Sequence, residues 1–145
     1  MIYSCYSGTG KTTLCKKIDG FDLDSSAYSK EPNWAKKYCE DAKRLSADGK
    51  KVFISAHKEV IKYLIKHKIE FVLCIPDGSH AEWLSRLVFR YCQTPTDGNR
   101  NAVIDCVKNF DNDMAFYKTL SCPIIKVKAK SIQTDLEEKI LKLMC

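Results

Sequence analysis

The residues best suited to chemistry lie at the start of the chain, in the run Cys5-Tyr6-Ser7-Gly8-Thr9-Gly10-Lys11-Thr12-Thr13. Apolar residues precede this run and a short amphipathic segment, 14–18, follows it, so the pattern predicts a strand, a glycine-rich turn and a helix. Gly8 and Gly10 allow the backbone to turn tightly and to direct N–H groups toward an anion. The start of the helix adds further unpaired N–H groups. The sequence therefore predicts a loop that binds phosphate groups.

Lys11 and Thr12 are the side chains of this run that can contact a nucleotide directly. The Lys11 ammonium can reach the β- and γ-phosphates, and the Thr12 hydroxyl can bind Mg²⁺. An ordinary glycine-rich turn before a helix is the alternative. Cys5 stands where the full pattern has a glycine, and a side chain is tolerated there only if its φ is negative. The residues predicted to bind ATP are Ser7, Gly8, Thr9, Gly10, Lys11, Thr12 and Thr13.

Two carboxylates follow this loop along the chain. Residues 21–24 predict a second, short strand, in which Asp22 and Asp24 share a face because side chains alternate along a strand. Ligands bind at the carboxyl ends of parallel strands, where a carboxylate can hold Mg²⁺, bind a substrate hydroxyl or act as a base. We predict that Asp24 acts in catalysis and in binding substrate and metal, and that Asp22 binds substrate. Turn formation and helix capping are the alternative for both.

Three further candidates follow later strands. His57 comes directly after an apolar strand, 51–55, and either contacts substrate or only begins the next helix. Arg86 and Arg90 are four residues apart in a predicted helix, 79–93, so that both lie on one flank. Two guanidinium groups there suit a phosphate clamp, and surface arginines paired with acids are the alternative. The buried stripe of the same helix is predicted to be Trp83, Leu84, Leu87, Val88 and Tyr91.

The remaining segments alternate between strand and helix. Residues 94–99 predict a polar loop, extending to 101, that can close over a nucleotide. Two helices, or one broken helix, are predicted at 102–110 and 113–120. The other predicted elements are helices at 33–46 and 59–67, strands at 70–75 and 124–127, and a last helix capped by Thr134. This alternation predicts an α/β fold with a parallel sheet covered by helices on both faces.

Composition limits the classes of protein that the chain can represent. A length of 145 residues with 45% hydrophobic residues suits a single globular domain, 1–145. No apolar run is long enough to span a membrane, and the predicted first strand leaves no room for a signal peptide, so we expect a cytoplasmic protein. The net charge of +6 suits binding of nucleotides or nucleic acid, although a solvated surface explains it equally well. The oligomeric state stays open.

The eight cysteines are spread along the chain without any C-x-x-C pair. Most of them lie in apolar segments, where a reduced thiol acts as a small hydrophobic side chain. This pattern favours buried thiols over disulfides or a zinc site.

Together these features resemble small P-loop kinases, a group that includes nucleoside monophosphate kinases, shikimate-type kinases and polynucleotide kinases. In particular, the chain resembles small nucleotide-kinase-like proteins encoded by bacteriophages, which would work in the host cytoplasm. The shared features are the P-loop and the segments 21–26, 52–60 and 82–86. The resemblance implies a P-loop NTPase fold with sheet order 2-3-1-4-5, and ATP with Mg²⁺ as the donor. It also implies that Asp22 and Asp24 contact acceptor or metal and that Arg86 and Arg90 hold the transferred phosphate.

The function predicted on this basis is a nucleoside monophosphate kinase that uses MgATP, with Lys11, Asp24, Arg86 and Arg90 in catalysis. The first alternative is a kinase of a hydroxyl on nucleic acid, at a 5′ end or on a modified base, with Asp24 as the base. The second alternative is a nucleotide-binding or sensor protein without turnover. It is motivated by Cys5 and by the lack of an acid in the third strand.

Overall fold

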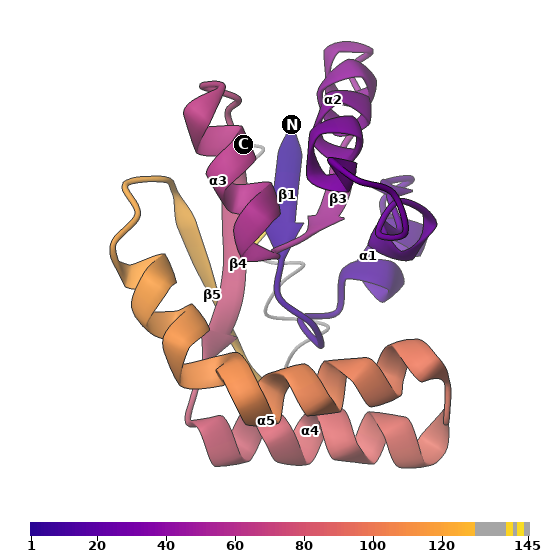
Figure 1. Cartoon of the computed structure of the whole chain (residues 1–145), viewed down its shortest axis with the longest axis vertical. Coiled ribbons are helices and arrows are strands. Elements are labelled where there is room, and N and C mark those ends of the chain that lie inside the picture. Colours follow the sequence, from indigo (N-terminus) through magenta and orange to yellow (C-terminus); the bar gives the residue numbers. More distant parts are fainter. Residues whose placement is uncertain (130–138, 141, 144–145) are drawn as a thin grey trace.

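The computed structural model of the chain describes residues 1–129, 139–140 and 142–143. In this part of the chain, five strands form one parallel sheet in the order β2-β3-β1-β4-β5 (Figure 1). The predicted α/β class and the predicted sheet order are confirmed. In chain order the strands are β1 Ile2–Cys5, β2 Phe21–Asp22, β3 Val52–Ser55, β4 Val72–Asp77 and β5 Ile124–Lys128.

The central strands are buried on both sides, which explains their nearly continuous apolar sequences. Helices surround the sheet: α2 and α3 pack together in front of β3 and β1, and α4 and α5 run side by side below the carboxyl ends of the strands (Figure 1). Ligands bind at this edge in open α/β sheets. The helices are α1 Lys11–Lys17, α2 Trp34–Ala47, α3 Lys58–Lys66, α4 His80–Gln93 and α5 Asp97–Lys118, with a short 3₁₀ helix η1 at Ser25–Ala27.

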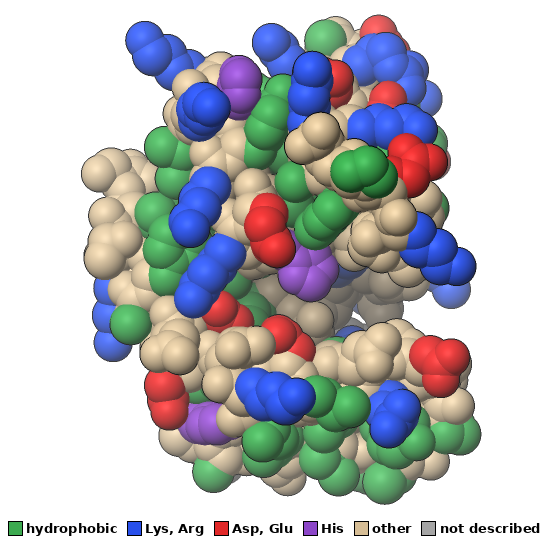
Figure 2. All heavy atoms as spheres, viewed as in Figure 1, with side chains coloured by type: hydrophobic (Ala, Val, Ile, Leu, Met, Phe, Trp, Pro, Cys, Tyr) green, Lys and Arg blue, Asp and Glu red, His purple; other side chains and the backbone are tan. Residues whose placement is uncertain are grey.

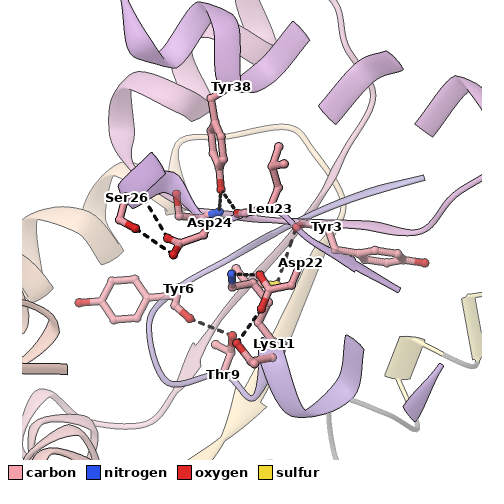
Figure 3. A network of polar contacts seen from close by, with 12 residues as sticks. Tyr3, Tyr6, Thr9, Lys11, Asp22, Leu23, Asp24, Ser26 and Tyr38 are labelled. Atoms are coloured by element: carbon pink, nitrogen blue, oxygen red, sulfur yellow. Dashed lines mark hydrogen bonds and ion pairs between the residues drawn. The ribbon is translucent and has the colours of Figure 1, made fainter. Parts of the chain in front are cut away.

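Tyr38 of α2 joins the ends of β2 and β3. Beyond the pair Asp22–Phe53 the two strands separate, and the Tyr38 hydroxyl lies between them. It donates to the Leu23 carbonyl at 2.7 Å and accepts from the Ser55 N–H at 2.9 Å, and the side chain is fully buried (Figure 3). The hydroxyl thereby replaces the next rung of the ladder and fixes where the chain after β2 lies relative to the end of β3.

The fourth strand differs from the predicted 70–75, because it begins at Val72 and continues through Pro76 to Asp77. Proline lacks an N–H, so it fits a strand only where no partner needs that donor. The carbonyl of Cys74 faces β1, where it accepts from Tyr6, so the alternating backbone directs Pro76 to the same side. There β1 has already ended at Cys5. Pro76 therefore leaves no carbonyl of β1 unpaired.

The prediction of a loop over 94–101 and of a break near 109–112 is wrong, because α5 is one continuous helix. Its N-cap is Thr96, whose hydroxyl accepts from the N–H of Asn99, so the loop between α4 and α5 is only a few residues long. Asn109 is accommodated inside the helix because its amide donates to Asp105 one turn earlier, at 2.8 Å, and does not compete with the backbone.

Other boundaries differ by a few residues. The first helix begins at Lys11, three residues before the predicted 14–18, and β2 ends at Asp22 because Asp24 caps η1. Val88 was predicted to be buried in α4 but is 40% exposed, since the buried face of that helix is the narrower one that carries Trp83 and Leu87. Thr134 and the start of the last predicted helix lie outside the described residues. Within those residues no helix combines the length and apolar character needed to cross a bilayer.

The predicted thiols are largely buried, as expected for small hydrophobic side chains. Cys92 departs from this pattern because it lies on the outer face of α4. The buried members of the set are Cys5, Cys15, Cys39, Cys74 and Cys106.

The Tyr38 hydroxyl can be tested by Tyr38→Phe. The variant leaves the partly buried Ser55 N–H and the buried Leu23 carbonyl without a partner, so we expect the free energy of unfolding in urea to fall by about 1–3 kcal/mol. Tyr63→Phe is the matched control, because that hydroxyl donates to Glu40 at the exposed surface, and its loss should change stability by less than about 0.5 kcal/mol. Equal losses in both variants would contradict the role assigned to Tyr38.

Candidate functional site

The loop of residues 6–10, here called the glycine loop, connects β1 to α1. Its turn depends on two glycines with positive φ, +85° at Gly8 and +91° at Gly10. Gly10 is the N-cap of α1, and no side chain caps this helix. The first bond of the helix runs from Leu14 N–H to the Gly10 carbonyl, so the N–H groups before it have no helical acceptor. Cys5 is the last residue of β1 and has an extended backbone, so its side chain introduces no strain.

Thr9 was predicted to bind ATP, and the structure turns its side chain into the protein. Its N–H and its hydroxyl both donate to the Tyr6 carbonyl, at 3.3 and 2.8 Å, and the residue is fully buried (Figure 3). These two bonds close the loop on itself. Thr9 therefore shapes the glycine loop, while its neighbours Gly8 and Gly10 line a cleft.

Helix α4 holds the other side of the glycine loop. Trp83 Nε1 donates to the Ser7 carbonyl and Arg86 Nε donates to the Gly8 carbonyl, both at 2.9 Å. Because C=O and N–H of one peptide point in opposite directions, the N–H of Gly8 is directed away from Trp83. The packing is close: a Cβ on Gly8 would lie 2.8 Å from Leu87 Cδ2.

Lys11 and Thr12 both contact Asp22 at the end of β2. The ammonium of Lys11 pairs with Asp22 Oδ1, and the Thr12 hydroxyl donates to Oδ2 at 2.7 Å (Figure 3). A hydroxyl and a carboxylate on neighbouring elements are the kind of oxygen ligands that Mg²⁺ binds. The sequence assigned the metal to Thr12 and Asp24, whereas the structure brings Asp22 and not Asp24 to Thr12.

Asp24 caps η1 and at the same time lines a cleft. Its carboxylate accepts from the Ser26 N–H at 2.9 Å and from the Ser26 hydroxyl at 2.8 Å (Figure 3). The backbone hydrogen bond from Ser26 is the main cause that lowers the pKa of Asp24, and partial burial opposes it. The carboxylate is therefore ionised at neutral pH and is held in a fixed orientation.

Arg86 and Arg90 lie close together in the same cleft. Burial lowers the pKa of both guanidinium groups, and the charge of Arg90 lowers that of Arg86 further. Arg90 Nε is buried without a hydrogen-bond partner. Among the described residues no carboxylate forms an ion pair with either arginine. The alternative that acids neutralise them at the surface therefore has no support in this part of the chain.

The cleft has a volume of about 820 Å³, and Figure 2 shows the molecule hollowed at the right, between the lower layer of α4 and α5 and the rest. His57, the N-cap of α3, lines it and meets the Trp34 ring edge to face at 5.7 Å. Asp22 contacts Lys11 at its border. The predicted site residues that the cleft brings together are Ser7, Gly8, Gly10, Lys11, Thr12, Thr13, Asp24, His57, Arg86 and Arg90.

The site predictions from the sequence missed several residues that line the cleft. Trp34 lies in the predicted helix 33–46 and belongs to no motif, yet it is only half-buried and lines the cleft. Asn99 and Asn101 lie in the segment 94–101, which is expected from the sequence to cover a nucleotide as a loop and instead lines the cleft mainly as the first turn of α5. The missed lining residues are Ser29, Trp34, Glu59 and Asp105.

Comparisons with known proteins show a shared fold. No protein-family model matches the chain, and no curated protein matches it. A crystal structure from Chloroflexus aurantiacus, described as that of a proposed kinase, aligns with a TM-score of 0.53 over 99% of this chain and 94% of that chain. The sequence identity is 14%, so the similarity concerns the fold alone.

The contact between Gly8 and α4 can be tested with two glycine variants. Gly8→Ala and Gly49→Ala both place a side chain at positive φ, which costs about 1–2 kcal/mol in each case. Only Gly8→Ala also crowds Leu87, because nothing lies within 4 Å of a Cβ at Gly49. We expect urea unfolding to show a larger loss for Gly8→Ala by about 1–3 kcal/mol. If the two losses are the same, the close packing of α4 on the loop is wrong.

Proposed function

We propose that the chain is a P-loop kinase, an ATP-dependent phosphotransferase whose donor phosphates lie between the glycine loop and α4. One observation carries this proposal. Arg86 and Arg90 are neighbouring, half-buried cations without a carboxylate partner among the described residues, and Arg90 Nε is buried and unpaired. Placing two like charges together is unfavourable unless an anion lies between them. A polyphosphate beside the glycine loop would supply that anion.

The residues around the loop fit MgATP. Lys11 lines the cleft from the first position of α1, and the uncapped start of that helix adds N–H groups beside it. Thr12 and Asp22 are the residues that would hold Mg²⁺, which neutralises phosphate charge when bound. Asp22 in β2 would take the place of the metal-binding carboxylate that the third strand lacks.

Catalysis would depend on position and charge. Lys11 and the two arginines would stabilise the charge on the transferred phosphoryl group, and Asp24 would orient the acceptor. Arg86 also donates to the Gly8 carbonyl, so one side chain both fixes the loop and faces the phosphate site. Cys5 was one reason to consider a protein that binds nucleotide without turnover. Its extended backbone accommodates the side chain, so this reason no longer applies.

The acceptor proposed from the sequence motifs is a nucleoside monophosphate, with a hydroxyl on nucleic acid as the alternative. The likeness to bacteriophage nucleotide-kinase-like proteins rests on the same motifs. The cleft volume of about 820 Å³ leaves room for a donor and an acceptor together.

ATP binding and ADP formation test this function. Lys11→Ala, Arg86→Ala and Arg90→Ala each remove a charge-assisted contact of about 1.5–3 kcal/mol, so we expect ATP affinity or turnover to fall about 10- to 100-fold. Calorimetric titration with ATP and Mg²⁺ measures the affinity, and coupled detection of ADP measures turnover.

Arg44→Ala is the matched control for these variants. Arg44 pairs with Asp41 on the exposed face of α2 and does not line the cleft, so this variant should retain both properties. ATP affinity and turnover that stay unchanged in all three cleft variants would exclude the proposed site.

A further inference from the structure

The charged side chains that line the cleft come from several elements. The cations are Lys11 of α1 and Arg86 and Arg90 of α4, beside the glycine loop. The carboxylates are Asp24 at η1, Glu59 of α3 and Asp105 of α5, and the imidazole of His57 lies with them in the lining. Three separate elements thus each bring a carboxylate to the cleft.

Two lysines lie near these carboxylates without lining the cleft. Lys58 pairs with the buried Asp113 at 3.4 Å, and Lys62 lines an adjoining cavity that Glu59 and Asp105 also line. On α2, Lys36 and Lys37 pair with Glu40 and Glu31 at the exposed surface. The lysine and arginine side chains that line the cleft are therefore Lys11, Arg86 and Arg90, which ATP would use.

This arrangement disfavours an acceptor that carries its own phosphate. A monophosphate brings about two negative charges at neutral pH and would have to lie among carboxylates without an arginine to bind it. The negative charge of these carboxylates leaves an uncharged acceptor unaffected and would attract a cationic one. Like-charge placement of this kind is a common way to reject the wrong partner.

The cleft also offers an aromatic ring and hydroxyl groups. Trp34 is half-buried and lines the cleft, where the ring of His57 meets it edge to face. An indole of this kind can stack on a flat ring. Ser25, Ser26 and Ser29 also line the cleft and can bond to hydroxyl groups of a substrate.

We propose that the acceptor is a phosphate-free alcohol carrying a flat ring, for which a nucleoside is the chemical type, and that Asp24, Glu59 and Asp105 exclude phosphorylated acceptors. This inference rests on the proposed kinase function. The acceptor oxygen forms a bond to the γ-phosphorus of ATP, and the bond from that phosphorus to the β,γ-bridging oxygen breaks. ADP leaves, and the hydroxyl proton passes to the Asp24 carboxylate and then to water.

The position of Asp24 fits this role. Both Ser26 donors hold its carboxylate, and no ion pair with a lysine or arginine neutralises it among the described residues. Asp22, by contrast, is occupied by Lys11 and Thr12. The two carboxylates therefore separate into one on the donor side and one that can receive the acceptor hydroxyl.

Matched pairs of acceptors test the proposal. The purified full-length chain would be given MgATP with each common ribo- and deoxynucleoside, with its 5′-monophosphate, and with a 5′-hydroxyl oligonucleotide, and ADP formation would be followed. We expect at least one nucleoside to be phosphorylated with a kcat/KM more than about 100-fold above that of its monophosphate. A monophosphate or the oligonucleotide used as well as or better than every nucleoside would overturn the proposal. So would transfer to no nucleoside while ATP still binds.

Variants without the carboxylate charges show whether these charges exclude phosphorylated acceptors or whether the substitutions only damage the site. Glu59→Gln combined with Asp105→Asn should raise kcat/KM for the monophosphates. The ratio of kcat/KM for a nucleoside to that for its monophosphate should fall about 10-fold, while ATP affinity stays unchanged. Glu40→Gln is the matched control, because Glu40 lies outside the cleft, and it should leave the preference as it is. An unchanged preference in the double variant would overturn the assigned role. If the wild-type chain does not bind ATP, the proposed kinase function is wrong, and the inference about the acceptor is wrong with it.

Discussion

The conformation of the glycine loop depends on two hydrogen bonds from α4, those of Trp83 to the Ser7 carbonyl and of Arg86 to the Gly8 carbonyl. Without them the two positive-φ glycines would allow many other turns, because glycine restricts the backbone so little. The bonds come from a helix more than seventy residues away in sequence, so the loop is defined only when the sheet has brought β4 beside β1. The hydrogen bond from Arg86 to the Gly8 carbonyl therefore fixes both the loop and the arginine. A change in α4 that displaced the arginine would also release the loop.

The position of the chain after β2 also depends on long-range hydrogen bonds, those of the Tyr38 hydroxyl. β2 pairs with β3 through only two residues, and the Tyr38 hydroxyl then bridges Leu23 and Ser55 where the strands separate. This separation lets the chain turn from Asp22, beside Thr12, to Asp24, which lines the cleft. A longer β2 would have kept both carboxylates on one face, because side chains alternate along a strand. The early end of the strand is what gives the two residues different surroundings.

Several features of the fold could be predicted because they depend on local pattern. Alternating apolar strands and amphipathic helices indicated the α/β class, and the glycine run at the first strand indicated where the cleft forms. The sheet order came from the resemblance to P-loop kinases. The pairing of Asp22 with Lys11 and Thr12 could not be predicted, since it depends on where β2 ends to within two residues. The part played by α5 was missed because Asp97, Gly98 and Asn99 have turn-forming sequences, and only the Thr96 cap makes them helical.

The two arginines that line the cleft without a carboxylate partner among the described residues have a consequence for stability. Arg86 and Arg90 lie half-buried beside one another, and a buried guanidinium nitrogen without a partner is costly. A protein selected for stability alone would place a carboxylate within reach, as it does for Lys58 with Asp113 at the other end of α5. The carboxylates that line the cleft come instead from η1, α3 and α5, and among the described residues none of them forms an ion pair with either guanidinium group. The two guanidinium groups therefore stay available to an anionic ligand. Unpaired cations and carboxylates within one cleft are difficult to explain by packing alone. They are what a site needs if it must bind both a polyphosphate and a neutral hydroxyl.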